Sequence, residues 1–303
     1  MRKILLSVAA VSMLMMACSK DDKNDNGGGN GNGNGNGDGT TNGATTAGSS
    51  YVLGILEPAN YNQYISKIIG QDNDTTWISY DANNRVSLVH EKYTKGQVTI
   101  SLMTPTYTDG KLVSHAQTYN NEPKQLDRGY TYDAKGKVQK ILYYEDGAWV
   151  YAYDSIAYNA AGKIEASYYY IKQSKTDPFY QAGKDVATYD AKGNITKIEE
   201  YWRTSATAPQ NKISTNNLEY DEKPNAFLPI LLHYDSFDLS RLSLHNVTKQ
   251  TILDEKGAVS DLITFAYEYD AAGFPIKMTV NELDKNTQAT TYTSVYTLSY
   301  NKK

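Results

Sequence analysis

The sequence predicts an all-β domain, an antiparallel up-and-down β meander of about 14–16 strands curled into an open barrel-like sheet, with one short helical insertion. Two observations predict it. A Tyr-Asp-Ala-x-Gly turn recurs at 132–136, 189–193 and 269–273, and Tyr-Asn-Ala-Ala-Gly at 158–162 keeps its frame. Turns of a second kind, such as Asp146-Gly147, fall about midway between them, so successive strands of roughly 8–12 residues run up and down.

Each copy of the repeat is expected to be a hairpin turn. Asp or Asn opens a type I turn because its short side chain bonds to backbone N–H groups ahead of it. The glycine three residues later takes the positive φ that a type I turn followed by a bulge requires. The expected turn pairs are Asp133 and Gly136, Asn159 and Gly162, Asp190 and Gly193, Asp254 and Gly257, and Asp270 and Gly273.

The residues on either side of the turns read as strands. Tyr130 and Tyr132 alternate with other residues before the turn, which is the period of two of a β-strand. After the turn the apolar residues fall three apart, as in Val138 and Ile141. A β-bulge would return both to the same face, so we expect a bulge in each hairpin.

The first 17 residues are typical of a lipoprotein signal peptide. Arg2 and Lys3 precede an apolar run that is too short to cross a bilayer. Leu-Met-Met-Ala-Cys at 14–18 resembles a bacterial lipobox, which implies cleavage before Cys18 and lipid attachment to its sulfur; the alternative is ordinary secretion. Cys18 is the one cysteine of the chain, which excludes internal disulfides, cysteine zinc sites and a thiol nucleophile in the folded part.

Residues 18–50 are expected to be the lipidated cysteine and a disordered tether. Gly, Asn, Asp and Thr dominate this stretch, so it cannot bury enough apolar area to fold. Ser-Lys-Asp-Asp at 19–22 is similar to the acidic export signal of Bacteroidetes surface lipoproteins. The expected location is therefore the outer membrane, anchored through Cys18, on the extracellular face.

The β-meander domain is expected to span 51–303. At Tyr220-Asp221-Glu222-Lys223-Pro224 the glycine position holds proline, which cannot take positive φ. The apolar residues that follow do not alternate, which predicts a helical insertion at about 225–243 that docks on the sheet or plugs one end of it. Near the start, residues 60–70 have an ambiguous pattern, in which the spacing of Tyr61, Tyr64, Ile65 and Ile68 fits a short helix.

Composition and motifs exclude several functions. The formal charge is −4 and no basic cluster is present, so no nucleic-acid partner is expected. No Gly-x-Ser-x-Gly, phosphate loop or His-Glu-x-x-His occurs, so we expect no catalytic residue, metal or cofactor and do not expect an enzyme. Glu199 and Glu200 are neighbours, but adjacent strand residues point to opposite faces and make a poor acid–base pair.

Aromatic residues are the one candidate for ligand contact. Trp149, Tyr151 and Tyr153 are expected to share one face of a strand, and Trp202 follows farther on; such rings can stack on sugars. The chain has 27 Tyr but five Phe and three Trp, and tyrosine stripes continue through every repeat. The packed face of a β meander is therefore the favoured explanation for them.

The repeats resemble the YD repeats of large bacterial surface and toxin-shell proteins. A closer likeness is to a family of Bacteroidales lipoproteins with a porin-like fold. It rests on the lipobox, the Gly/Asn tether, residues 130–138, Lys-Pro-Asn at 223–225 and Leu-Ser-Leu-His-Asn-Val-Thr-Lys at 242–249. The resemblance implies a curled, mostly antiparallel sheet, no known activity and no catalytic residues.

Three functions remain in view from the sequence. The first is a surface-exposed binding or scaffold lipoprotein with an unidentified glycan or protein partner. The second is an accessory protein that binds or degrades glycans. The third is a porin-like pore, which the charged residues of the predicted strands disfavour, because Lys197 and Glu200 place charge on both faces of one strand.

Overall fold

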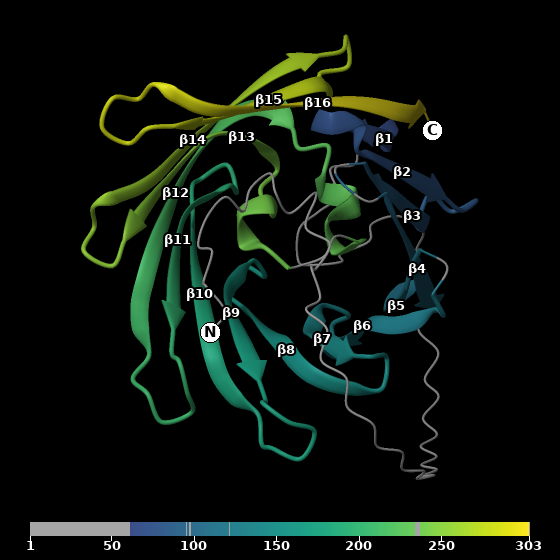
Figure 1. The fold of residues 1–303 in the computed structure, drawn as a ribbon, viewed down its shortest axis with the longest axis vertical. Helices are drawn as coiled ribbons and strands as arrows, with labels where there is room; N and C mark the ends of the chain where they lie inside the picture. The colour runs from purple at the N-terminus through teal and green to yellow at the C-terminus, as the bar shows by residue number, and fades with distance from the viewer. Residues whose placement is uncertain (1–60, 95, 97, 121, 234–236, 303) are drawn as a thin grey trace.

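The described residues form a closed barrel of 16 antiparallel strands joined in sequence order (Figure 1). The computed structural model describes residues 61–302 apart from 95, 97, 121 and 234–236, so the predicted signal peptide, Cys18, the tether and residues 51–60 lie outside the described part. The strands are β1 (Gln63–Ile69), β2 (Thr75–Tyr80), β3 (Val86–Tyr93), β4 (Thr99–Thr108), β5 (Lys111–Tyr119), β6 (Gln125–Tyr132), β7 (Val138–Glu145), β8 (Trp149–Tyr158), β9 (Ile164–Ile171), β10 (Tyr180–Tyr189), β11 (Ile195–Trp202), β12 (Asn211–Pro224), β13 (His245–Asp254), β14 (Val259–Tyr269), β15 (Pro275–Leu283) and β16 (Thr290–Lys302).

The predicted all-β meander is confirmed, and the sheet closes completely. The ring is completed where β1 pairs with β16, from Gln63 opposite Lys302 to Ile69 opposite Thr297. The expectation of a helix near Tyr61 was wrong, because these residues lead into the strand that closes the barrel. Closure removes both edges of the sheet and so satisfies their backbone groups.

The Tyr-Asp turns share one hydrogen-bond pattern. In the turn at 132–136, Gly136 has φ of +80° and its N–H donates to the carbonyl of Asp133 at 3.0 Å. The carboxylate of Asp133 accepts from the N–H groups of Lys135 and Lys137 at 2.9 and 2.8 Å. In the other turns a glycine at the same position also has positive φ: Gly162, Gly193, Gly257 and Gly273.

A β-bulge follows these turns, and a tyrosine hydroxyl donates a hydrogen bond to a backbone carbonyl beside it. Val138 faces Tyr132 while Lys140 faces Thr131, so one extra residue lies between Val138 and Lys140 and both Val138 and Ile141 are buried. A bulge disrupts the strand ladder. The hydroxyl of Tyr132 donates to the carbonyl of Leu112, which precedes the bulge of the preceding hairpin, at 2.7 Å.

This hydrogen bond recurs around the barrel, and we call the set the tyrosine ladder. Burial raises the pKa of Tyr132 and Tyr189 to about 12, so both hydroxyls stay protonated as donors. The ladder explains why tyrosine rather than phenylalanine fills these positions. Its other bonds run from Tyr80 to Ile65, Tyr107 to Val86, Tyr158 to Val138, Tyr189 to Ile164, Tyr220 to Ile195, Tyr267 to Val247 and Tyr300 to Pro275.

The predicted insertion folds into the barrel as two 3₁₀ helices, η2 (Leu228–His233) and η3 (Leu239–Arg241). We call residues 225–244, as far as they are described, the plug. Helix η2 contacts β3 and η3 contacts β11, which lie eight positions apart in the ring, so the plug spans the lumen (Figure 1). Its buried residues belong to both apolar clusters of the interior: Ile230 is part of one cluster and Leu242 of the other. None of the helices in the described residues has the length and hydropathy to cross a bilayer.

Candidate functional site

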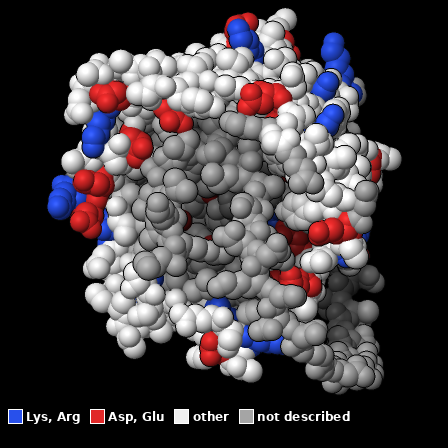
Figure 2. Space-filling view, viewed as in Figure 1, with Lys and Arg blue, Asp and Glu red and all other residues white. Residues whose placement is uncertain are grey.

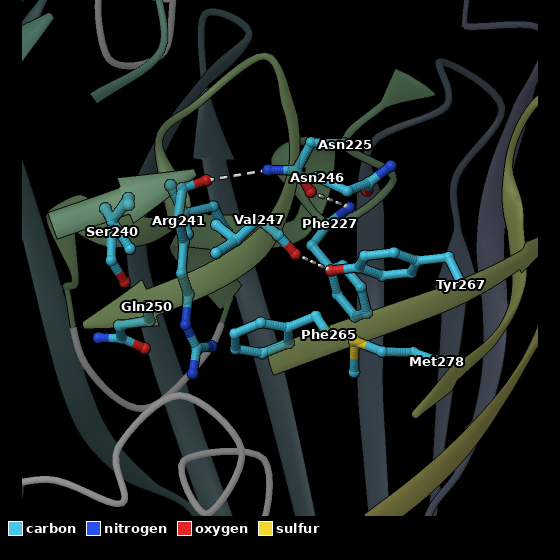
Figure 3. A pocket seen from close by; sticks show the side chains of 12 residues that line it. Asn225, Phe227, Ser240, Arg241, Asn246, Val247, Gln250, Phe265, Tyr267 and Met278 are labelled. Carbon is cyan, nitrogen blue, oxygen red and sulfur yellow. Dashed lines mark hydrogen bonds between the residues drawn. The ribbon is translucent and has the colours of Figure 1, made fainter. Parts of the chain in front are cut away.

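A cavity lies inside the barrel between the plug and strands β12 to β15 (Figure 3). It has an empty volume of about 700 Å³, which includes its opening to solvent. Most of its wall is apolar, with Phe227 and Leu231 contributed by the plug and Phe265 and Met278 by the barrel. Apolar cavities with a few polar groups are the usual sites for small ligands.

Three polar side chains of the cavity gather on one side, while Asn225 and Asn246 lie at its upper edge in Figure 3. Figure 3 shows Ser240, Arg241 and Gln250 at that side and Tyr267 and Met278 at the other. The guanidinium of Arg241 lies 3.6 Å from the carboxylate of Asp238, measured between Nε and Oδ2. The cavity therefore offers an apolar body and a polar end to a bound molecule.

Asn225 fixes the fold of the plug beside the cavity. Its side-chain amide donates to the carbonyls of Arg241 and Ser243, at 3.1 and 2.9 Å, and its side-chain oxygen accepts from the N–H of Phe227 at 3.1 Å. The hydroxyl of Tyr61 donates to the backbone carbonyl of Asn225 at 2.5 Å. One side chain thus joins the start of the plug to its end, which holds the wall of the cavity in place.

Two histidines connect the plug to the barrel wall. His115 Nε2 and His233 Nδ1 are 2.8 Å apart, and His115 Nδ1 is 2.9 Å from the hydroxyl of Tyr130, which also donates to the carbonyl of Leu232 at 2.8 Å. Burial lowers the pKa of His233 to about 3 and that of His115 well below its usual value. Both rings are therefore neutral at pH 7 and serve as hydrogen-bonding groups. Among the described residues, no group of His, Cys, Asp and Glu could hold a metal ion.

Carboxyl groups from neighbouring strands meet on the inner face of the barrel. Asp185 of β10 and Glu200 of β11 are direct cross-strand partners. Burial raises the pKa of Asp185 well above its usual value, and the Glu200 charge adds to this. Burial also raises the pKa of Glu200, and it raises that of Asp154 to about 6.

These acids connect to the cavity through amide side chains. Asn216 donates to Glu200 at 3.0 Å, and Gln250, which lines the cavity, donates to the side-chain oxygen of Asn216 at 3.0 Å. The sequence did not indicate this arrangement, because Asp185 and Glu200 carry no motif and meet only through the strand register. It did indicate that Glu199 and Glu200 diverge: Glu199 lies 3.3 Å from Lys197 of the same strand, whereas Glu200 is turned to the interior.

The aromatic candidates do not form one surface. Tyr153 stacks on Tyr170, with centroids 4.7 Å apart, whereas Trp202 stacks on Tyr169 at 5.8 Å and belongs to the inward-facing row of Glu200. Tyr151 is the extra residue of a bulge, since Tyr143 faces Ala152 and Tyr144 faces Val150.

The bulge separates the contacts of the three aromatic residues of β8. The ring of Tyr151 lies 6.5 Å from that of Tyr143, while Lys172 lies over Trp149 at 4.9 Å. Tyr151 and Tyr153 therefore have different neighbours, and the expectation that alternation would give one face to this stretch was wrong.

The fold defines a plugged, closed up-and-down β-barrel, and solved structures align with it to different degrees. A porin-like protein from Bacteroides uniformis aligns with a TM-score of 0.50 and 14% identity, over 78% of this chain and 98% of that one. A porin-like protein from Bacteroides vulgatus aligns with a TM-score of 0.41 and 14% identity, over 78% and 99%. The Photorhabdus luminescens Tc holotoxin pore aligns with a TM-score of 0.30 and 16% identity, over 73% of this chain and 9% of that one.

The first of these alignments shows the fold alone, which is porin-like in shape. No protein-family model matches the chain, and no curated protein matches it.

Proposed function

We propose that the protein is a lipid-anchored binding protein of the outer membrane, on its extracellular face, and that its ligand site is the cavity beside the plug. The observation that carries the proposal is the cavity itself, with an apolar wall and a polar end inside a closed barrel. The lipobox-like sequence ending at Cys18 and the acidic stretch after it support the anchor and the location. The likeness in fold to the porin-like protein from Bacteroides uniformis, together with the Tyr-Asp turns, supports membership of the Bacteroidales lipoprotein family.

A membrane-spanning pore is a weaker candidate because the outward side chains are charged. Lys249 of β13 pairs with Glu219 of β12 at 3.3 Å, and Lys277 of β15 pairs with Glu268 of β14 at 2.7 Å; all four side chains are more than two-fifths exposed. A membrane barrel needs an apolar outer band, and a lysine at the bilayer midplane costs about 2–4 kcal/mol. Here the apolar clusters fill the interior instead. Figure 2 shows acidic and basic side chains interspersed around the rim of one face.

The ligand site can be tested with an uncharged apolar fluorophore, N-phenyl-1-naphthylamine, added to the mature chain. We expect saturable binding at one site. Ser240→Trp places an indole at the cavity and should weaken binding, whereas Thr264→Trp, on the outward face of β14, should leave it unchanged. Absence of saturable binding, or equal loss in the two variants, would contradict a ligand site in the cavity.

The anchor can be tested separately by extraction. A Cys18→Ala variant is expected to leave the membrane fraction without detergent, because nothing else in the proposal holds the domain there. A pore would still require detergent. Protease shaving of intact cells tests the extracellular face, since a domain that stays protected until the membrane is broken is not on the surface.

A further inference from the structure

The outward face of β7 to β12 carries an ordered row of lysine and tyrosine residues. Six residues are direct cross-strand neighbours, one from each strand, in the order Lys140, Ser155, Tyr168, Lys184, Tyr201 and Lys212. We call this set the tyrosine–lysine row. Neighbouring strands lie about 4.8 Å apart, so the row runs roughly 24 Å across the sheet.

The register shows that the row faces outward. Ser167, Asp185 and Glu200 are also consecutive cross-strand partners, and they adjoin the row one position farther along each strand. Glu200 lies on the same face as Ile198, which packs against the plug in the interior cluster. Because side chains alternate along a strand, Tyr168, Lys184 and Tyr201 point away from the lumen.

Within the row, a lysine ammonium group lies beside two tyrosine rings. The ammonium of Lys184 lies 5.7 Å from the ring centroid of Tyr168 and 5.8 Å from that of Tyr201. In the adjacent part of the face, the Lys140 ammonium lies 4.6 Å over the ring of Tyr153, which stacks on Tyr170. Both tyrosine rings of the row remain partly exposed.

The row is cationic in an acidic chain. It holds three lysines and no carboxylate, although the whole chain has a formal charge of −4. The nearby Glu199 is already shared between Lys197 at 3.3 Å and Lys212 at 3.8 Å. Elsewhere on the outward face, Lys249 and Lys277 each pair with a glutamate of the neighbouring strand. Among the described residues, Lys140 and Lys184 of the row therefore have no carboxylate partner, whereas Lys212 shares Glu199 with Lys197.

We propose that the tyrosine–lysine row binds an acidic polysaccharide, independently of the cavity. Tyrosine rings stack on the C–H faces of sugar rings, and Tyr168 and Tyr201 are two strands apart, roughly 10 Å. The lysines beside them pair with carboxylate or sulfate groups. A straight row on a sheet face fits an extended chain with regularly spaced charges. A membrane surface fits less well, because the row offers no apolar side chain to insert.

The test measures binding of the mature chain to polygalacturonate, with neutral dextran, phosphatidylglycerol vesicles and poly(dT) as comparison probes. We expect polygalacturonate to bind, with an affinity that falls as salt rises, and dextran to bind at least tenfold more weakly. Tyr168→Ala is expected to weaken binding about fivefold or more, by analogy with ring stacking on nucleobases. Lys184→Gln should lower the slope of log affinity against log salt by about 1.

Lys249→Gln is the matched control, since it removes an outward lysine of another strand and should leave binding unchanged. The thermal midpoint of each variant shows whether the barrel is intact. Equal binding of dextran, an equal effect of Lys249→Gln, or tighter binding of the vesicles or poly(dT) would each overturn the proposal. None of these outcomes depends on binding of the fluorophore in the cavity.

Discussion

The hairpins of the barrel wall and the plug are held by different kinds of interaction. The hairpins that begin at Tyr132, Tyr158 and Tyr189 share the same turn and the same bond of the tyrosine ladder, so the loss of one bond affects one hairpin among several. The plug is held by bonds that occur once, such as those of Asn225 and the contact between His115 and His233. Repetition gives the wall its shape, whereas the unrepeated contacts determine what the interior can hold.

The largest effect is expected from the apolar core of the plug. Leu242 is 1% exposed and belongs to an interior cluster that includes Ile198 and Leu218 of the wall. Leu242→Ala should lower the free energy of unfolding by about 2–5 kcal/mol, because it leaves a cavity in a packed core. Chemical denaturation measures the loss. A loss below about 1 kcal/mol would show that the plug contributes little to the stability of the barrel.

The histidine contact predicts a dependence of stability on pH. The folded-state pKa of His233, about 3, lies below the unfolded value near 6.5. As pH falls below 6.5, the unfolded chain therefore binds a proton that the folded chain does not, and stability is lost. Between pH 6 and 4, His233→Gln should lose less stability than the wild type, by up to about 1.4 kcal/mol per pH unit.

Raised carboxyl pKa values act in the opposite direction. Asp154, at about 6, keeps its proton in the folded state over a range where the unfolded chain has lost it, so this group favours folding as pH falls. Both the wild type and His233→Gln contain Asp154. Its contribution therefore cancels when the unfolding free energies of the two proteins are subtracted. Parallel pH profiles for the two proteins would contradict a neutral, buried His233.

Replacing a turn glycine should lower the free energy of unfolding less than truncating the core of the plug. Gly136 has φ of +80°, and a Cβ there would meet the Lys111 side chain no closer than 3.5 Å, so the cost comes from the backbone rather than from a clash. Gly136→Val should cost on the order of 1–3 kcal/mol and Gly136→Asn less, since Asn84 has φ of +59° in the first turn. Lys135→Val, at the exposed turn tip, is the control. Equal shifts of the denaturation midpoint for the two valine variants would disprove the role assigned to Gly136.

Two tyrosines of one strand compare the wall with the plug directly, and the wall tyrosine should give the smallest effect. Tyr130 and Tyr132 lie on the same face of β6; Tyr130 bonds to the plug and Tyr132 to the wall. Tyr130→Phe leaves a buried carbonyl and a buried histidine without this hydroxyl and should cost about 1–3 kcal/mol. Tyr132→Phe affects a half-buried bond and should cost about 1 kcal/mol. Chemical denaturation should give a lower midpoint for Tyr130→Phe than for Tyr132→Phe, and the reverse order would contradict the comparison.

Much of the wall could be predicted from the sequence because its signals are local. The turn at Asp133 and Gly136 and the bulge after Val138 involve residues within ten positions of one another. The acceptor of a ladder tyrosine is 15–25 residues away, so the pattern showed the tyrosines without showing their partners. Strand β1 was misread for a related reason. Ile65 and Ile68 are three apart because a bulge lies between Ile65 and Lys67, and this spacing also fits a helix.

The site could not be predicted because it forms between distant segments. The cavity needs Phe227 and Arg241 of the plug to face Phe265 and Met278 of the wall. His115 and His233 are 118 residues apart, and Asp185 meets Glu200 only through the strand register. No local sequence pattern predicts such contacts between distant residues. The insertion itself was visible, since Pro224 replaces a turn glycine, but its place in the lumen depends on a closed ring around it.

The closing pair of β1 and β16 also determines when the fold can be completed. Strand β1 lies between β2 and β16, so the ring stays open until β16 is present. Contacts between strands so far apart in sequence form slowly, because a long loop must be closed first. During synthesis the growing sheet has two free edges, each able to pair with another chain. Only the arrival of the last strand removes both edges.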